Sequence, residues 1–161
     1  MYTMKTNLLI MLFTAVISGN QIFAVEMDWT QWRGPNRDGV VTGKIWPNDL
    51  KATHLASKWR VELGSSYSGP IMDGDTVYVT ESSGENEVVR ALDRTNGKEK
   101  WRHTWAGKMS VPFFAAKNGS WIRSTPALAN GKLFVAGMKD HLLCIDIKTG
   151  KRLWEINFPK E

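Results

Sequence analysis

Short runs of alternating apolar and polar residues fill the second half of the chain. In residues 76–80, two valines alternate with Thr, Tyr and Thr, which is the two-residue period of a β-strand. The pairs Asp73-Gly74 and Asn130-Gly131 are tight-turn signals, and each separates a first strand from a second one. Residues 87–92 and 141–145 are the predicted third strands. No convincing helical period accompanies them, so the pattern predicts an all-β fold.

The pattern occurs twice along the chain. Residues 91–101 (ALDRTNGKEKW) align without a gap with residues 144–154 (CIDIKTGKRLW) at an offset of 53. Upstream, segments within residues 68–79 match segments within 124–135 at an offset of 56. The difference between the two offsets falls in a hairpin loop, around residues 82–86 in the first copy. Because loops tolerate changes of length, the pattern indicates a duplicated structural unit.

Each copy contains the turn Asp-x-x-x-Gly-Lys, and a fourth strand follows it. Glycine in this turn is expected to supply a positive φ, and the fourth strand is predicted to end at a tryptophan. The residues that carry the repeat are Asp93, Gly97 and Trp101 in the first copy and Asp146, Gly150 and Trp154 in the second.

The sequence Ala-Leu-Asp-x-x-x-Gly-Lys-x-x-Trp resembles the blade repeat of the PQQ-like (quinoprotein-type) β-propellers, which include quinoprotein alcohol dehydrogenases and BamB-like proteins. The resemblance covers residues 29–158. It implies that the tryptophan that closes each blade, Trp101 or Trp154, docks against the neighbouring blade. Trp59 resembles the closing-strand tryptophan of a preceding blade. The segment that begins at Trp29 (WTQWRGPNRDG) resembles the start of secreted bacterial members.

The predicted architecture is a partial β-propeller of about two four-stranded antiparallel blades plus an extra closing strand. We divide the chain into a signal peptide (1–24), an N-terminal extended segment (25–56) and propeller blades (57–161). A closed propeller needs about four to eight blades, and repeat units need neighbours to bury their faces. We therefore expect an N-terminal fragment of a longer protein, or a chain that assembles with further blades or a partner protein.

The first 24 residues have the order of an export signal. Lys5 precedes an apolar stretch from Leu8 to Ile17, and Ala24 is the small residue at the expected cleavage point. This stretch is shorter than the roughly 20 residues that span a bilayer, so no transmembrane segment is expected after cleavage. The prediction is an exported protein, periplasmic or extracellular; the alternative is an N-terminal anchor that is retained.

Composition narrows the possible partners and chemistry. The 21 Lys and Arg exceed the 16 Asp and Glu, but no run of five basic residues occurs, so nucleic acid is not indicated. The only cysteine, Cys144, excludes an internal disulfide and an all-cysteine metal site. The histidines, His54, His103 and His141, have no metal-ligand spacing. No metal site is predicted.

The longest predicted connection, residues 102–123, combines aromatic and basic side chains. Its candidate ligand-binding residues are Trp105, Phe113, Phe114, Trp121 and Arg123. Such a set suits a peptide, a glycan or an anionic group. The alternative is that Phe113, Phe114 and Trp121 plug the propeller face or cover a neighbouring blade.

The function predicted for this chain is a binding or scaffold module, with no catalytic residue and no cofactor of its own. The resemblance also leaves an enzyme open, as a fragment of a PQQ-dependent alcohol or sugar dehydrogenase with PQQ and calcium as cofactors. Such enzymes hold the quinone between a tryptophan and a disulfide of adjacent cysteines, beside calcium and a catalytic aspartate. Cys144 has no second cysteine with which to form that disulfide.

Overall fold

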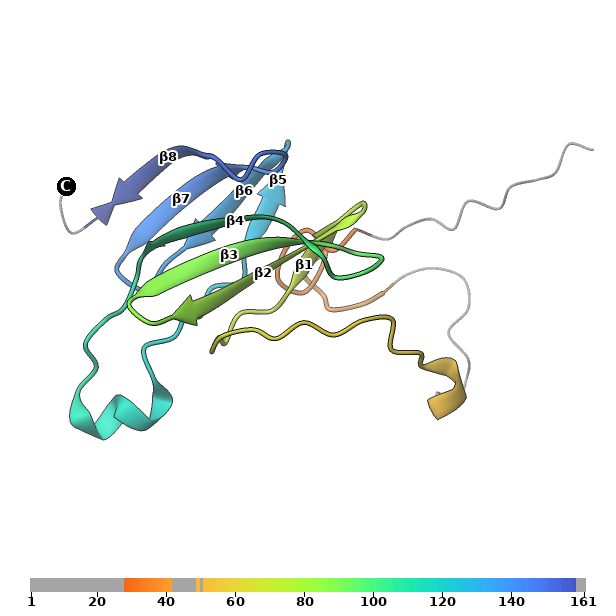
Figure 1. Cartoon of the computed structure of the whole chain (residues 1–161), viewed down its shortest axis with the longest axis horizontal. Helices are drawn as coiled ribbons and strands as arrows, with labels where there is room; N and C mark the ends of the chain where they lie inside the picture. The colour runs from red at the N-terminus through yellow and green to blue at the C-terminus, as the bar shows by residue number, and fades with distance from the viewer. Residues whose placement is uncertain (1–27, 42–48, 50, 159–161) are drawn as a thin grey trace, which may run out of the picture.

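The computed structural model describes residues 28–41, 49 and 51–158, and it contains two four-stranded antiparallel sheets (Figure 1). Blade 1 comprises β1 (Ile71–Asp73), β2 (Thr76–Ser83), β3 (Asn86–Asp93) and β4 (Glu99–Ala106). Blade 2 comprises β5 (Ala127–Ala129), β6 (Lys132–Ala136), β7 (His141–Asp146) and β8 (Arg152–Asn157). Two short 3₁₀ helices, η1 (Ala52–His54) and η2 (Phe113–Asn118), lie outside the sheets. The all-β prediction and the two blades are confirmed, and the predicted signal peptide lies outside the described residues.

The predicted turns close the hairpins. Asn130 and Gly131 between β5 and β6 have φ of 50° and 70°, and Gly74 between β1 and β2 has φ of 51°. Glycine and asparagine tolerate this left-handed backbone, which two-residue hairpin turns favour. The strands on either side are thereby held in antiparallel register, with Ile71 opposite Tyr78 and Ala127 opposite Phe134.

The core lies between the two blades. One cluster of buried side chains combines residues of both sheets and the connection between them: Ile71, Tyr78, Val89, Ala91, Trp105, Ile122, Leu133, Val135, Leu143 and Ile145. The alternating positions of each strand face this cluster, as a half-buried sheet requires. Burial of this shared surface therefore fixes the two blades against each other.

The fourth strands are longer than the sequence predicted. The prediction that they end at Trp101 and Trp154 was wrong, because β4 continues to Ala106 and β8 to Asn157. Residue 106 still pairs with β3, opposite Asn86. The long connection therefore starts at residue 107 instead of residue 102. The missed signal was the alternation from Trp101 to Trp105, in which the odd-numbered side chains are the more buried ones.

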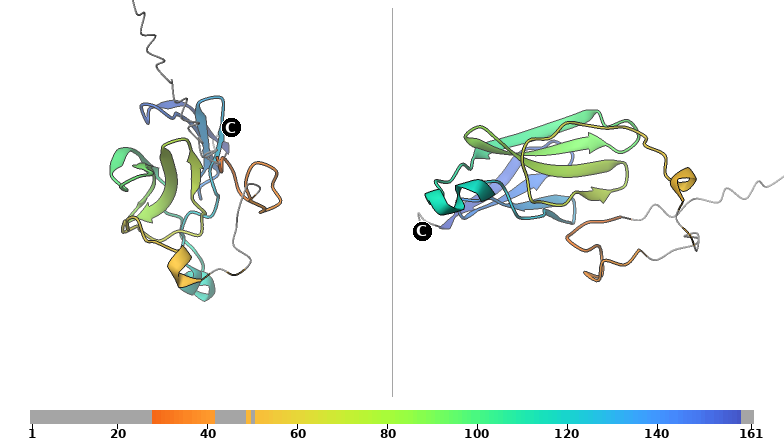
Figure 2. Two further views of the ribbon diagram at one scale, coloured as in Figure 1. Left: turned by 90° about the vertical axis from the view of Figure 1, so that its right-hand side faces the viewer. Right: turned by 90° about the horizontal axis from the view of Figure 1, so that it is seen from below.

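Two further segments lie against blade 1, one over the sheet face that points away from blade 2 and one at the edge formed by β1. Residues 57–64 run extended over that face, and in the described part of the chain their nearest pairing is an isolated bridge between Ser65 and Ser82. The segment that begins at Asp28 contacts the first strands of both sheets, β1 and β5, and then loops away from them (Figure 2). Trp29 exchanges backbone hydrogen bonds of 2.8 and 2.9 Å with Met72 in β1. The next carbonyl, that of residue 30, accepts a 2.8 Å bond from the N–H of Leu128 in β5.

None of the helices in the described ranges has the length and apolar character needed to cross a membrane.

Candidate functional site

The closing tryptophan of blade 1 docks against the turn of blade 2. The indole Nε1–H of Trp101 donates a 2.7 Å hydrogen bond to the carbonyl of Ile147. Its ring covers Gly150, where a β-carbon would lie 2.7 Å from ring atoms. Gly150 also has φ of 69°. Two independent constraints, backbone conformation and lack of space, therefore require glycine at this position. Trp101 thus makes a contact of the kind that the family resemblance implies.

Trp59 makes the same contact one unit earlier. Its Nε1–H donates a 2.8 Å hydrogen bond to the carbonyl of Arg94, and its ring lies over Gly97, which has φ of 74°. Each tryptophan thus covers the Asp-x-x-x-Gly-Lys turn of the next blade in sequence. Trp59 has the position of a closing-strand residue, although its segment does not form a ladder among the described residues.

Trp154 has no corresponding turn to cover in the described chain. It is 41% exposed and contacts Phe134 at a ring-centroid distance of 6.0 Å. The register places Phe134, Cys144 and Trp154 in one row across blade 2. A second row on the same face consists of Ala136, Leu142 and Ile156. We call these six residues the open face of blade 2.

The aspartates of the repeat cap their own turns. Asp93 Oδ1 accepts hydrogen bonds from the hydroxyl and backbone N–H of Thr95, at 2.5 and 2.8 Å. Asp146 accepts bonds from the hydroxyl and backbone N–H of Thr149, which lies one position later in its turn, at 2.8 and 2.9 Å. These bonds favour the carboxylate form and hold the pKa of both aspartates below its ordinary value. The structure thus assigns both aspartates a structural task.

A buried carboxylate that the sequence analysis missed connects the blades. Glu87 in β3 is 1% exposed and accepts a 2.7 Å hydrogen bond from the indole Nε1–H of Trp105. It also accepts bonds of 3.0 and 3.2 Å from the backbone N–H of Met138, in the β6–β7 connection of blade 2. Burial raises the pKa of Glu87, while these hydrogen bonds and the charge of Lys139 oppose the rise.

The predicted ligand loop separates into three parts. Trp105 does not belong to it, because this residue lies in β4 with its side chain buried against Glu87. Phe113 and Phe114 lie on η2 and are 91% and 76% exposed, so they cover no described blade. Trp121 and Arg123 lie near the start of β5 and pack against Tyr67.

The Tyr67 ring organises this last part. Its centroid is 5.4 Å from that of Trp121, and the guanidinium carbon of Arg123 lies 4.9 Å from it. The Tyr67 hydroxyl donates a 3.0 Å bond to the carbonyl of Asn118. Sequence reasoning selected two of these residues and missed Tyr67, because its partners lie more than 50 residues away along the chain.

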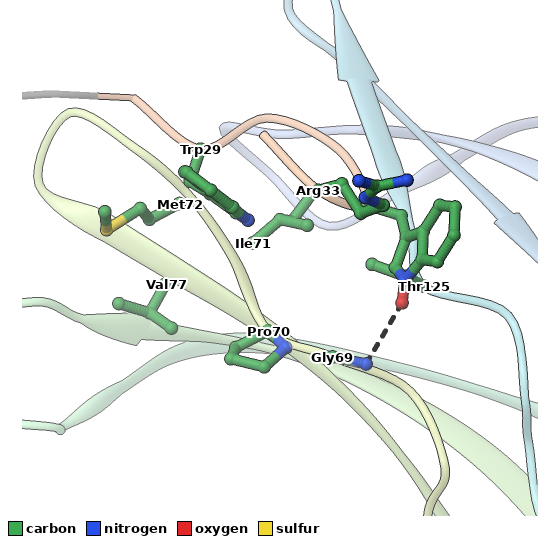
Figure 3. A pocket seen from close by; sticks show the side chains of 9 residues that line it. Trp29, Arg33, Gly69, Pro70, Ile71, Met72, Val77 and Thr125 are labelled. Atoms are coloured by element: carbon green, nitrogen blue, oxygen red, sulfur yellow. Dashed lines mark hydrogen bonds between the residues drawn. The ribbon is translucent and has the colours of Figure 1, made fainter. Parts of the chain in front are cut away.

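A groove lies at the inner edge of the blades, beside this aromatic group (Figure 3). Its apolar part has a volume of about 360 Å³, with Trp29, Trp32, Arg33, Gly69, Pro70, Ile71, Met72, Val77 and Thr125 as its lining. A second part shares Trp32, Gly69 and Thr125 and adds Tyr67 and Arg123. We call the two parts together the inner-edge groove.

The chemistry of the inner-edge groove suits a molecule with an apolar body and an anionic group. Thr125 Oγ1 accepts a 3.0 Å bond from the backbone N–H of Gly69, so its own hydroxyl proton can be donated elsewhere. Arg33 and Arg123 each donate to a backbone carbonyl, and neither forms an ion pair with a described carboxylate. Arginine is well suited to bind carboxylate or phosphate.

No group of three or more His, Cys, Asp or Glu that could hold a metal ion occurs within residues 28–41, 49 and 51–158. Cys144 is buried in β7, and burial raises the pKa of its thiol.

Residues 85–161 match a protein-family model described as "Outer membrane protein assembly factor BamB". The 1-butanol dehydrogenase (cytochrome c) of Thauera butanivorans is 32% identical over 137 residues, which are 79% of this chain and 18% of that protein. The lanthanide-dependent methanol dehydrogenase of Methylacidiphilum fumariolicum is 26% identical over 150 residues, 86% of this chain and 23% of that protein.

Among solved structures, the quinohemoprotein alcohol dehydrogenase of Comamonas testosteroni matches with a TM-score of 0.52 and 21% identity. The match covers 81% of this chain and 19% of that structure. This similarity supports the fold. The chain therefore spans about a fifth of the length of these relatives.

Proposed function

We propose that this chain is part of a PQQ-like β-propeller and serves as an exported binding or scaffold module whose open blade face docks a further blade or a partner protein. The observation that carries the proposal is the correspondence between two rows of residues. The row Tyr78, Ala91 and Trp101 of blade 1 faces blade 2. The row Phe134, Cys144 and Trp154 has the same place in blade 2 and forms part of its open face.

The occupied interface defines what would fit the open one. Trp101 needs a carbonyl acceptor for its indole N–H and a glycine beneath its ring, and blade 2 supplies both. A partner that covers Trp154 in the same way must therefore present a turn of the same type. A further PQQ-like blade has this turn, whether it belongs to the same polypeptide or to another protein.

Self-association of the expressed chain tests the docking surface. If the open face is a docking surface, light scattering should detect oligomers that form with increasing concentration, because association removes the apolar face from water. The variant Trp154→Ser/Ile156→Ser is then expected to be monomeric. The matched control is Leu153→Ser/Phe158→Ser, which removes two exposed apolar residues outside the open face and should still associate. A monodisperse wild-type monomer that melts cooperatively would contradict the proposal.

Export is tested separately by the mature N-terminus. The signal order of residues 1–24 predicts cleavage near Val25. Mass spectrometry of the exported product should find a chain that begins at or near this residue. Recovery of intact Met1 in the exported fraction would show that the segment is not removed.

A fragment of a quinone-dependent dehydrogenase is the second candidate, favoured by the names of the dehydrogenase relatives. The disulfide that would stack on the quinone does not fit this chain, because Cys144 is the only cysteine and is buried. The inner-edge groove could still contact one side of a planar anionic molecule. Reconstitution with PQQ and calcium, followed by dye-reduction assays with alcohols, decides between the candidates. Stoichiometric quinone binding with alcohol-dependent turnover would establish the enzyme.

A further inference from the structure

The connection from blade 1 to blade 2 carries an exposed aromatic tip. Residues 107–126 leave the sheets, and η2 lies beyond the strand ends (Figures 1 and 2). Phe113 and Phe114 stand at its start, 91% and 76% exposed. Their rings contact each other edge to face, with centroids 5.7 Å apart and planes at 80°. We call these two residues the Phe tip.

The exposure of the Phe tip contrasts with a well-anchored base. Tyr67 bonds to the carbonyl of Asn118, which is the last residue of η2. Gly119, with φ of 63°, packs against the Trp121 ring and turns the chain back toward blade 2. Ile122 is fully buried and donates a 2.9 Å backbone bond to Ser82 Oγ. The base is therefore held in place, and the apolar side chains point away from it into solvent.

The charge around the Phe tip has one sign within its own segment. Residues 107–126 contain three basic residues, Lys108, Lys117 and Arg123, and no acidic residue. Lys117 lies in the last turn of η2 and is exposed. Lys108 is also exposed and pairs with Glu85 of the β2–β3 turn. Lys117, the basic residue nearest in sequence to the two phenylalanines, thus carries a positive charge without an ion-pair partner among the described residues.

From these observations we propose that the Phe tip inserts into the interface of a lipid bilayer that bears anionic headgroups. A convex apolar tip with cationic side chains beside it is complementary to such a surface, because aromatic rings partition below the headgroups and lysine ammonium groups stay among them. A tip of two rings buries little area, so the apolar and electrostatic contributions are both needed for binding. The docking of blades through Trp154 does not enter into this proposal.

Co-sedimentation with vesicles tests the proposal. Wild-type chain should bind vesicles of phosphatidylcholine mixed with phosphatidylglycerol, and it should bind much less to phosphatidylcholine alone. Phe113→Ser/Phe114→Ser should weaken binding to the anionic vesicles by about tenfold or more, since each ring loses its apolar partition. Lys117→Gln should weaken it by about fivefold, the effect of roughly one kcal/mol per basic residue at an anionic surface. Near-UV circular dichroism should be unchanged in both variants, because these side chains are exposed.

The matched control is Leu153→Ser/Phe158→Ser, which removes two apolar side chains that are 49% and 58% exposed and lie on or after β8. It should bind the anionic vesicles as wild type does. Equal loss in the control and the Phe-tip variant would mean that general apolar exposure causes the binding, and it would overturn the proposal. Absence of wild-type binding would also overturn the proposal, and a protein partner would then be the alternative ligand of the Phe tip.

Discussion

The two carboxylate oxygens of Glu87 in blade 1 share a bifurcated hydrogen bond from the backbone N–H of Met138 in blade 2, at 3.0 and 3.2 Å. A side chain that is 1% exposed thus links two repeats across their interface. Space around it is tight, because a β-carbon on Gly137 would meet Glu87 at 2.5 Å. The carboxylate keeps its hydrogen bonds within a site that disfavours its charge, which makes the interface sensitive to protonation.

The Glu87 site predicts a pH-dependent contribution to stability. Burial raises the pKa of Glu87 above its ordinary value of 4.5, so the folded state binds the proton more tightly than the unfolded state. The contribution of Glu87 to the free energy of unfolding therefore falls as pH rises from 4.5 through the folded-state pKa, and it is constant above that pKa. Urea unfolding at a series of pH values should show that the free energy of unfolding of wild type falls relative to that of Glu87→Gln as pH rises through this window.

The control for this measurement is Glu85→Gln, which alters an exposed carboxylate on the neighbouring turn. A pH-dependent difference that occurs in Glu87→Gln and does not occur in Glu85→Gln would belong to the Glu87 site. A difference between wild type and Glu87→Gln that stays constant with pH would show that Glu87 keeps an ordinary pKa in the folded state.

Trp101 and Trp154 occupy equivalent places in the repeat but should differ in their contribution to stability. Trp101→Ala loses a docked ring and the 2.7 Å bond to the Ile147 carbonyl. We expect it to lower the free energy of unfolding by about 3 kcal/mol, the lower end for truncation of a large aromatic side chain. Trp154→Ala should cost about 1 kcal/mol, because its ring covers no neighbouring turn among the residues that the structure describes. Equal losses in chemical denaturation would contradict the docking assignment.

Gly150 and Gly131 provide a matched pair for the contact beneath Trp101. Both have nearly the same backbone, with φ of 69° and 70°, but only Gly150 has neighbouring atoms within 4 Å of a built β-carbon. Alanine at either position adds the strain of a left-handed residue, of about 1 kcal/mol. Gly150→Ala should cost about 2 kcal/mol more than Gly131→Ala, because it also displaces the Trp101 ring. Thermal unfolding of both variants measures the difference. Equal losses of stability would show that the Trp101 ring moves away from residue 150 without an energetic cost.

The turn aspartates can be tested by amide hydrogen exchange. Asp93→Ala removes the acceptor for the backbone N–H of Thr95 and Asn96, at 2.8 and 3.3 Å, so these amides should exchange about tenfold faster. The equivalent amides of Lys148 and Thr149, which bond to Asp146, serve as an internal control and should not change. Faster exchange in both turns would indicate a global loss of stability instead.

The same turns also predict acid sensitivity in the opposite sense to Glu87. Hydrogen bonds from Thr95 hold the pKa of Asp93 below its ordinary value of 3.8. Protection of the Thr95 amide should therefore persist at pH 3.8 and disappear as pH falls through the lower folded-state pKa. Loss of protection already above this pH would contradict the assignment.

The repeat, the two blades and the hairpin turns could be predicted from the sequence, and the family resemblance implied the docking of Trp101. Each of these depends on local chemistry: alternation within a strand, a left-handed glycine in a turn, and a tryptophan at a fixed place in the repeat. The two copies of one pattern also place Trp101 and Trp154 at equivalent positions of the repeat. The ends of β4 and β8 were missed, since strand length depends on how far the neighbouring strand continues to offer partners.

Which distant residues meet depends on the tertiary structure. Glu87 finds Met138 across 51 positions, and the segment at Trp29 pairs with Met72 in β1 while its next residue pairs with Leu128 in β5. The inner-edge groove and the exposed Phe tip arise in the same way, from segments that the folded blades bring together or leave uncovered. Such contacts have no local signature, because burial is a property of what packs around a side chain and not of the side chain's own sequence neighbours.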